Sequence, residues 1–429
     1  MGTMWHGLTR RLGLGGQPKP GLTAEWPAPA TELGLTGIIP LPLRLGPSPD
    51  GRDWRGELSI ALAGSGTVLF REAVTLGADW REIDLKLHSH LLPNGETGLR
   101  ARLAAERGAA TPWEGEVWLR VANSGKLAEA VRGSLRRYKT PVFFTGPCDS
   151  RYYDYRDEGL TPWFDRADAP QRIARLLAEG RVSEAEAGWL GDFVRDGFVV
   201  MEGLLEPALM AQVGEELEDA VAKEFNGYCY GSSQRVEGLH RAYPGVRRLW
   251  AHPAIRHMLE LLFDERARPC QTLTFIFGSQ QDAHQDTIHL TPFPAGYMCG
   301  VWVAVDDVRP DSGELVVYRG SHRRERLRLA ELGCAKVTGG DWSEFGATVV
   351  PRWRAMAETG AFETVIYRPK RGTVLIWHEN LLHAGSPRRD PELSRRSIVS
   401  HVFADGALAY YDSTGLVGYM EPLETLPNA

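Results

Sequence analysis

Apolar and polar residues alternate with a period of two in two separate parts of the chain, and this pattern strongly limits its possible folds. The first part covers about residues 37–122, where Leu58 and Ile60, for example, alternate with polar neighbours. Short runs of this kind, separated by turn sequences such as PSPDG and LPNGE, predict an antiparallel β-sandwich. The second part begins after about residue 270 and contains seven or eight predicted strands, which indicate a β-barrel or jelly roll.

Helical patterns lie between the two strand-rich parts. A helix is predicted after Ala169 and Pro170, and Ser183 with Glu186 forms a capping box ahead of a second helix. Further predicted elements are a strand over 198–201 and helices over 206–223 and 253–263. The fold class expected is therefore mainly β with helices, divided into a lead-in over 1–36, a β-sandwich accessory domain over 37–122, a connector over 123–168 and a C-terminal jelly-roll domain over 169–429.

Composition excludes several classes of function. The formal net charge of −6 gives no sign of a general affinity for nucleic acid or for an anionic membrane. The chain has no apolar run of about eighteen residues, which a membrane span needs. Five scattered cysteines without a CxxC pair favour reduced thiols, and the first residues lack a signal-peptide pattern. We therefore expect a cytoplasmic protein with no nucleic-acid partner.

The sequence His284-Gln285-Asp286 is the first candidate for a metal site. Residues two apart on a strand point to one face, so the side chains of His284 and Asp286 can converge on one ion. His383 in GTVLIWHENLLHAGSP is the best candidate for a third ligand, and His378 in the same segment competes with it. Two imidazoles and one carboxylate on one side of an ion leave its other side open, as non-haem Fe(II) oxygenases require.

Five segments around these residues occur in a characteristic order: RDGFVVMEGLLEP, HQD, PDSGELVVYRGSHR, PKRGTVLIWHENLLHAGSP and RRSIVSHVF. Together they resemble the phytanoyl-CoA dioxygenase family over about residues 185–404. The resemblance implies a double-stranded β-helix, the jelly roll expected above. It also implies that His284, Asp286 and His383 ligate Fe(II).

The same resemblance implies a site for 2-oxoglutarate. In RRSIVSHVF, Arg395 corresponds to the arginine that binds the far carboxylate of the cosubstrate, because a guanidinium can form two hydrogen bonds with it. Ser397, two residues later on the same strand face, would add a contact. Arg396 is a rival, because the loop after His383 is one residue longer than usual. Further residues on strands that line the cosubstrate pocket in relatives are Gln271, Thr272 and Trp302.

These features predict an Fe(II)- and 2-oxoglutarate-dependent dioxygenase, a hydroxylase that uses O2 on an unactivated C–H bond and releases succinate and CO2. The expected substrate is a small molecule, a lipid or a glycan, and homo-oligomer formation stays open. One alternative is a cupin-like metal enzyme that needs no 2-oxoglutarate. Another is a carbohydrate-binding protein with a non-catalytic barrel, in which Trp80, Trp113 or Trp118 would form a flat platform for a sugar.

Overall fold

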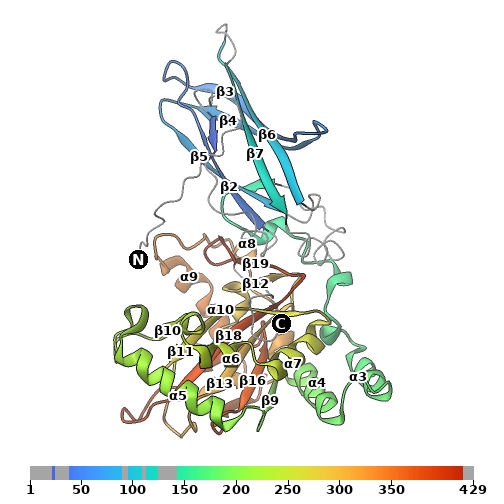
Figure 1. Cartoon of the computed structure of the whole chain (residues 1–429), viewed down its shortest axis with the longest axis vertical. Coiled ribbons are helices and arrows are strands. Elements are labelled where there is room, and N and C mark those ends of the chain that lie inside the picture. Colours follow the sequence, from blue (N-terminus) through green and yellow to red (C-terminus); the bar gives the residue numbers. More distant parts are fainter. Residues whose placement is uncertain (1–21, 25–37, 89–94, 109–112, 124–142, 419–429) are drawn as a thin grey trace. The chain divides into compact units, whose positions relative to one another are not determined.

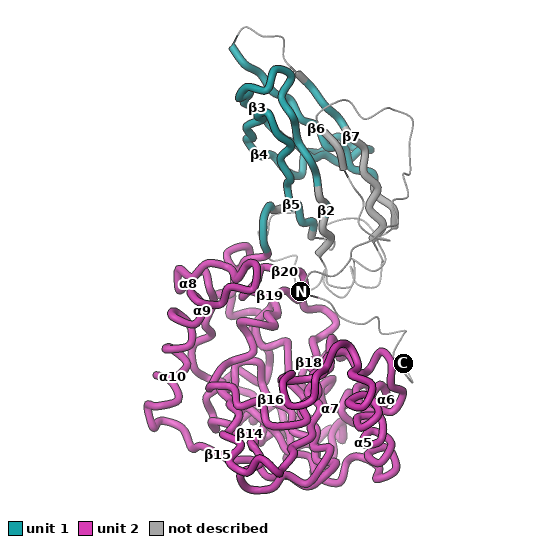
Figure 2. The backbone as a smooth tube through the Cα atoms, turned by 90° about the vertical axis from the view of Figure 1, so that its left-hand side faces the viewer, with its two compact units in different colours: residues 1–147 teal, residues 148–429 magenta. Residues whose placement is uncertain are grey.

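The structure, a computed structural model, describes residues 22–24, 38–88, 95–108, 113–123 and 143–418. The chain divides into two compact units, residues 1–147 and 148–429 (Figures 1 and 2). The division falls inside the predicted connector. Each unit has a hydrophobic core of its own and is described separately.

Unit 1 consists of two antiparallel four-stranded sheets, with the strand orders β1-β2-β5-β8 and β4-β3-β6-β7. The strands are β1 (Leu22–Ala24), β2 (Ile38–Leu45), β3 (Trp54–Leu62), β4 (Val68–Leu76), β5 (Arg81–His88), β6 (Gly95–Glu106), β7 (Trp113–Asn123) and β8 (Phe143–Thr145). Alternate residues of both sheets, such as Leu43 and Leu85 from one and Leu58 and Leu103 from the other, share one buried core. The period of two in the sequence therefore reflects strands with one buried face.

Two segments of unit 1 differ from the sequence expectation. The lead-in over 1–36 is not wholly irregular, because β1 pairs with β2. The connector over 123–168 contributes β8, which pairs with β5. Neither strand has a clear alternation of its own, since each is only three residues long.

Unit 2 is organised around a six-stranded antiparallel sheet with the strand order β10-β11-β18-β13-β16-β9. Its strands are β9 (Phe198–Met201), β10 (Val236–Glu237), β11 (Ala267–Phe275), β13 (Met298–Ala304), β16 (Val374–His378) and β18 (Ser397–Ala404). The helices on one side of this sheet are α3 (Ala169–Ala178), α4 (Glu184–Asp196), α5 (Pro207–Ala222), α6 (Pro244–Trp250) and α7 (Pro253–Phe263) (Figure 1). Residues Val301, Ile376 and Val402 of the sheet share a core with these helices.

The other face of the six-stranded sheet packs against a smaller sheet of order β15-β14-β17, formed by Thr364–Tyr367, Leu315–Tyr318 and His383–Gly385. Trp302, Leu375 and Val399 from the large sheet form a second core with Leu315 and Val317. A third sheet contains β12 (Thr291–Phe293), β19 (Leu408–Tyr411) and β20 (Leu416–Val417). The candidate site lies on this second face.

Shorter elements complete unit 2. The 3-10 helices are η3 (Ser150–Tyr152), η4 (Glu158–Leu160), η5 (Trp163–Asp165), η6 (Phe225–Gly227), η7 (Leu239–Arg241), η8 (Asp286–Ile288) and η9 (Ser321–Arg323). Three helices after β14 have no counterpart in the sequence expectation: α8 (Leu329–Leu332), α9 (Ser343–Thr348) and α10 (Val350–Glu358). No helix in the described part of the chain combines the length and the apolar character needed to cross a bilayer.

Local signals explain why several helices of unit 2 begin and end where they do. The capping box of Ser183 and Glu186 opens α4, as predicted, and Gly197 ends it with a left-handed backbone (φ 81°). A proline occupies the first turn of α5 and α7, where its missing N–H costs nothing. The predicted strand over 198–201 and the helices over 206–223 and 253–263 are confirmed within one residue at each end.

Candidate metal centre

Three side chains from two distant segments of unit 2 lie close together. The ligand atoms of His284, Asp286 and His383 all lie within 4.8 Å of one another. Asp286 Oδ1 is 3.8 Å from His284 Nε2 and 3.8 Å from His383 Nε2. Asp286 and His383 are buried and His284 is half-buried. Two nitrogens and one oxygen at this spacing can bind one divalent transition-metal ion.

The backbone brings the two histidines together by an antiparallel bridge. His284 N–H donates to His383 O (2.9 Å), and His383 N–H donates to His284 O (3.1 Å). The expectation that His284, Gln285 and Asp286 lie on one strand is wrong, because Asp286 begins η8. Thr287 N–H donates to Glu379 O, which ties this turn to the segment before His383. The ligands therefore converge through a bridge and a turn rather than through strand alternation.

Backbone carbonyls orient both imidazoles. His284 Nδ1 lies 2.8 Å from Asp282 O, and His383 Nδ1 lies 3.0 Å from Leu381 O. Since a carbonyl oxygen only accepts, each Nδ1 carries the proton and each Nε2 has a free lone pair. Both lone pairs belong to the nitrogens that face Asp286. This is the arrangement in which histidine binds a metal through Nε2.

The protonation states also suit a cation. Burial, and then the neighbouring His383, lower the pKa of His284 to about 4. Burial opposes ionisation of Asp286, but the nearby histidines His383, His401 and His284 more than offset it and hold the pKa of Asp286 well below its usual range. Near neutral pH the site therefore holds an ionised carboxylate and a neutral His284.

Arg395 and Ser397 lie on the same face of the six-stranded sheet, at the start of β18. Arg395 Nη1 donates to Ser397 Oγ (3.2 Å), and the guanidinium lies over the Trp302 ring at 5.5 Å from its centroid. Arg395 is only 3% exposed, and its Nε has no hydrogen-bond partner among the residues that the structure describes. Burial lowers the pKa of Arg395 to about 10. A buried cation of this kind is expected to receive an anion.

Arg396 points away from this group. Its guanidinium forms two hydrogen bonds with Asp306 (2.6 and 2.7 Å) and one with Glu218 (2.9 Å). Adjacent residues of an extended chain point to opposite sides, which explains the difference between Arg395 and Arg396. The acids Asp306 and Glu218 thus occupy the guanidinium of Arg396, whereas Arg395 pairs with no acid among the described residues.

The three remaining predicted residues divide between the two faces of the sheet. Trp302 and Gln271 share the face of Arg395, and Gln271 Nε2 lies 3.1 Å from His401 Nδ1. Thr272 is on the opposite face, where its Oγ1 lies 2.8 Å from His240 Nδ1. Strand alternation turns the side chain of Thr272 toward the helices, so the structure does not bring Thr272 together with Arg395, Gln271 and Trp302.

His378, the rival third ligand, is outside the triad. Its Nε2 lies 3.3 Å from Asp165 Oδ2, and its Nδ1 accepts from Asn380 N–H (2.9 Å). Asp165 also pairs with Arg326, which in turn pairs with Glu379. His378 therefore belongs to a buried ion-pair network that holds the segment before His383.

Two residues that the sequence reading did not single out contact Asp286. Trp377 Nε1–H donates to Asp286 Oδ2 (2.8 Å), and His401 Nε2 lies 3.3 Å from the same oxygen. Strand parity could have identified His401. Ser397, Val399 and His401 are alternate residues of β18, so their side chains lie on the same face of the sheet. Trp377 could not be found from spacing alone, because its role depends on which strand pairs with β16.

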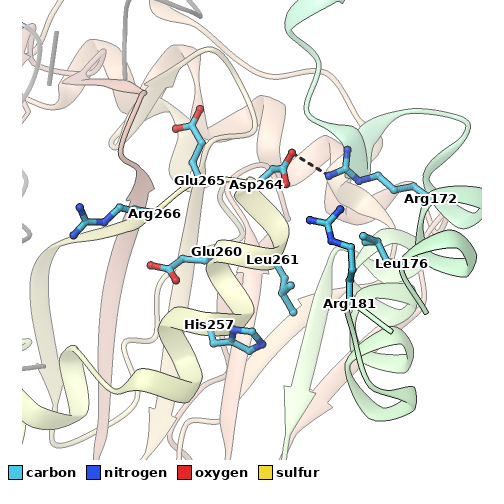
Figure 3. Close-up of a pocket in the computed structure, with 9 residues that line it drawn as sticks. All are labelled: Arg172, Leu176, Arg181, His257, Glu260, Leu261, Asp264, Glu265 and Arg266. Atoms are coloured by element: carbon cyan, nitrogen blue, oxygen red, sulfur yellow. Dashed lines mark ion pairs between the residues drawn. The ribbon is translucent and has the colours of Figure 1, made fainter. Parts of the chain in front are cut away.

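A separate pocket of about 350 Å³ opens on unit 2 beside α3 and α7 (Figure 3). Its wall contains both signs of charge, and Arg172 pairs with Asp264 across it (3.1 Å). The lining residues are Arg172, Leu176, Arg181, His257, Glu260, Leu261, Asp264, Glu265 and Arg266. None of the predicted site residues is among them.

Comparison with known proteins gives one family and several solved structures. Residues 193–397 match the family model described as Phytanoyl-CoA dioxygenase. Among solved structures, the non-heme alpha ketoglutarate dependent carbocyclase SnoK from nogalamycin biosynthesis is 17% identical over 53% of this chain and 86% of its own (TM-score 0.43). The epimerase SnoN with Fe3+ and alpha ketoglutarate is 20% identical over 52% and 85% (TM-score 0.41). EctD from S. alaskensis with bound Fe is 19% identical over 52% and 77% (TM-score 0.41). No curated protein sequence gives a significant match.

Proposed function

Because residues 193–397 carry a domain that matches the phytanoyl-CoA dioxygenase family, we propose that the chain is an Fe(II)- and 2-oxoglutarate-dependent oxygenase. In this proposal His284, Asp286 and His383 bind the iron, and Arg395 with Ser397 binds the cosubstrate. Gln271 and Trp302 support that pocket. The reaction proposed is hydroxylation of an unactivated C–H bond in a small molecule, a lipid or a glycan.

The observation that carries the proposal is the buried guanidinium of Arg395 on the same sheet face as the triad. Among the described residues, no carboxylate lies within ion-pair distance of it, and the acid that most raises its pKa is Glu314. Burying a charge without a partner is costly, and a ligand that supplies the opposite charge would offset this cost. A dicarboxylate such as 2-oxoglutarate fits this requirement, since one of its carboxylates is free for Arg395 when the other end faces the metal.

The donor set of the triad fits Fe(II). Two neutral imidazole nitrogens and one carboxylate oxygen are the ligands of non-haem Fe(II) oxygenases, and they occupy one side of the ion. When bound, the iron with 2-oxoglutarate and O2 supplies the oxidising chemistry that yields succinate, CO2 and a hydroxylated product. The chain's own contribution is to orient the ligands and to bury Arg395. The attraction between a guanidinium and a carboxylate is stronger in a buried site than in water.

Several finer interpretations belong to the same proposal. The large sheet and the sheet β15-β14-β17 are interpreted as the two halves of a double-stranded β-helix, and the two sheets of unit 1 as a β-sandwich. The five cysteines, all of them described residues, form no disulfide, which agrees with the expected cytoplasmic location. Trp80 is 40% exposed and Arg44 lies over its ring, whereas the side chains of Trp113 and Trp118 lie outside the described residues. The sugar-platform alternative therefore stays a prediction.

Conversion of 2-oxoglutarate tests the proposal. The purified protein is incubated in air with Fe(II), ascorbate and 2-oxoglutarate, and succinate is measured with and without a panel of small molecules, lipids and glycans. We expect succinate formation that requires both Fe(II) and 2-oxoglutarate and is lost in Asp286→Ala. A cupin-like enzyme without the cosubstrate would bind Fe(II) but would give no succinate under any condition.

A further inference from the structure

The two carboxylate oxygens of Asp286 have different surroundings. Oδ1 faces the histidine ligands, at 3.8 Å from each Nε2. Oδ2 accepts a hydrogen bond from Trp377 Nε1–H (2.8 Å) and lies 3.3 Å from His401 Nε2. Asp286 itself is 7% exposed, so water does not compete freely for either oxygen. Oδ1 is therefore directed to the metal position, and Oδ2 is already engaged by Trp377 and His401.

Gln271 determines which nitrogen of His401 carries the proton. Gln271 Nε2 lies 3.1 Å from His401 Nδ1, and an amide nitrogen only donates. His401 Nδ1 therefore accepts, and the proton is on Nε2, which faces Asp286 Oδ2. The reverse arrangement would direct a lone pair of His401 at the carboxylate. Gln271 therefore donates to His401, and His401 donates to Asp286 Oδ2.

These groups form a single row across four neighbouring strands. Gln271 on β11 is the register partner of His401 on β18, His401 is the partner of Gly300 on β13, and Gly300 is the partner of Trp377 on β16. A Cβ at Gly300 would overlap the Trp377 indole. Glycine at this position therefore lets the indole lie across β13 and reach Asp286. The ring of Trp377 also lies 5.0 Å from that of His383, centroid to centroid.

We propose that Trp377 and His401 are positioning residues that hold Asp286 Oδ2, so that the carboxylate binds the metal through Oδ1 alone, with Gln271 and Gly300 making this possible. A carboxylate bound through both oxygens would occupy one more position on the ion. Holding Oδ2 therefore reserves that position for other ligands. The inference rests on the proposed function, since it requires a metal at His284, Asp286 and His383. Groups that orient metal ligands typically change metal affinity about 10- to 100-fold when they are removed.

Co(II) titration of the metal-free protein tests the inference without relying on activity. The dissociation constant and the visible d–d spectrum are measured for the wild type, Trp377→Phe, His401→Leu and His401→Gln. We expect Trp377→Phe and His401→Leu to weaken Co(II) binding by about 10-fold or more and to alter the spectrum, because Oδ2 is free to bind. His401→Gln, whose amide can donate to Oδ2, should recover part of the affinity.

A matched control separates the loss of this hydrogen bond from general destabilisation. Trp163 is also buried, and its Nε1–H donates to Leu262 O (2.7 Å). Trp163→Phe should leave Co(II) affinity and spectrum unchanged. Gln271→Leu provides a milder variant if Trp377→Phe does not fold, with an expected loss of a few-fold.

The failures of the two proposals are distinguishable. A wild-type protein that binds no Co(II) would refute the metal site itself and with it the proposed function. Co(II) binding with wild-type affinity and spectrum in folded Trp377→Phe, His401→Leu and Gln271→Leu would refute the positioning role alone.

Discussion

Replacing Arg395 with methionine should separate ligand binding from protein stability. Methionine keeps an unbranched apolar side chain but removes the charge. Burial lowers the pKa of Arg395 to about 10, which corresponds to a cost of roughly 3 kcal/mol for keeping the cation buried. Arg395→Met should therefore leave the free energy of unfolding of the metal-free protein unchanged or raise it, by at most about 3 kcal/mol.

The same substitution should strongly weaken 2-oxoglutarate binding. A guanidinium forms two hydrogen bonds with a carboxylate, each worth about 1.5–3 kcal/mol. Losing both costs at least about 3 kcal/mol and raises the Kd for 2-oxoglutarate by about 100-fold or more. Isothermal titration calorimetry on the Mn(II)-loaded protein under anaerobic conditions measures this Kd, and urea denaturation measures the stability.

Arg268→Met is the matched control. Arg268 is equally buried (3% exposed) on β11, but it forms an ion pair with Asp405 (3.0 Å). Its loss should lower the free energy of unfolding by roughly 3 kcal/mol, because Asp405 loses its partner. The Kd for 2-oxoglutarate should be unchanged. The reasoning would be refuted if Arg395→Met bound 2-oxoglutarate as the wild type does, or if it lost stability as Arg268→Met does.

Three further predictions follow from the buried charges of unit 2. Arg326→Met removes the partner of Asp165 and Glu379 and should lower the free energy of unfolding by about 3–5 kcal/mol in urea denaturation; a loss below 1 kcal/mol would contradict this. Burial, and then His378, lower the pKa of His322 from 6.5 to about 3 in the folded protein. Between these two pH values His322 is protonated in the unfolded state but not in the folded state. The free energy of unfolding should therefore fall as the pH drops from about 6.5 toward 3. The expected slope from this group is about 1.4 kcal/mol per pH unit, and an equally steep slope in His322→Gln would refute it. Mn(II) at 100 times its Kd should raise the free energy of unfolding of the wild type by about 2.7 kcal/mol and that of Asp286→Ala by nearly nothing, as thermal melts can show.

Much of the fold could be predicted because its signals are local. The period of two before residue 122, the capping box of Ser183 and Glu186, and the prolines that open α5 and α7 all act within a few residues. The helices α8 to α10 after β14 were not predicted, although a proline lies in the first turn of α10. Two of them are only four and six residues long, too short for a helical period to be evident.

The candidate site was predicted only as far as residue types and parity allow. The three ligand residues could be proposed because HxD and the distant histidine lie within ordered segments that resemble one family, and the structure brings these residues together. Their geometry could not be predicted, because the bridge between His284 and His383 and the turn at Asp286 depend on tertiary contacts. The row from Gln271 to Trp377 depends on the register of four strands, which a single sequence does not determine.

The measurement that tests the central claim most directly is the anaerobic addition of Fe(II) and 2-oxoglutarate to the purified protein, followed by visible absorption. The account predicts a metal-to-ligand charge-transfer band that requires both additions, weakens in Arg395→Met and is absent in Asp286→Ala. A protein that binds Fe(II) at the triad but forms no band at any 2-oxoglutarate concentration would contradict the account and would favour a metal enzyme that works without this cosubstrate.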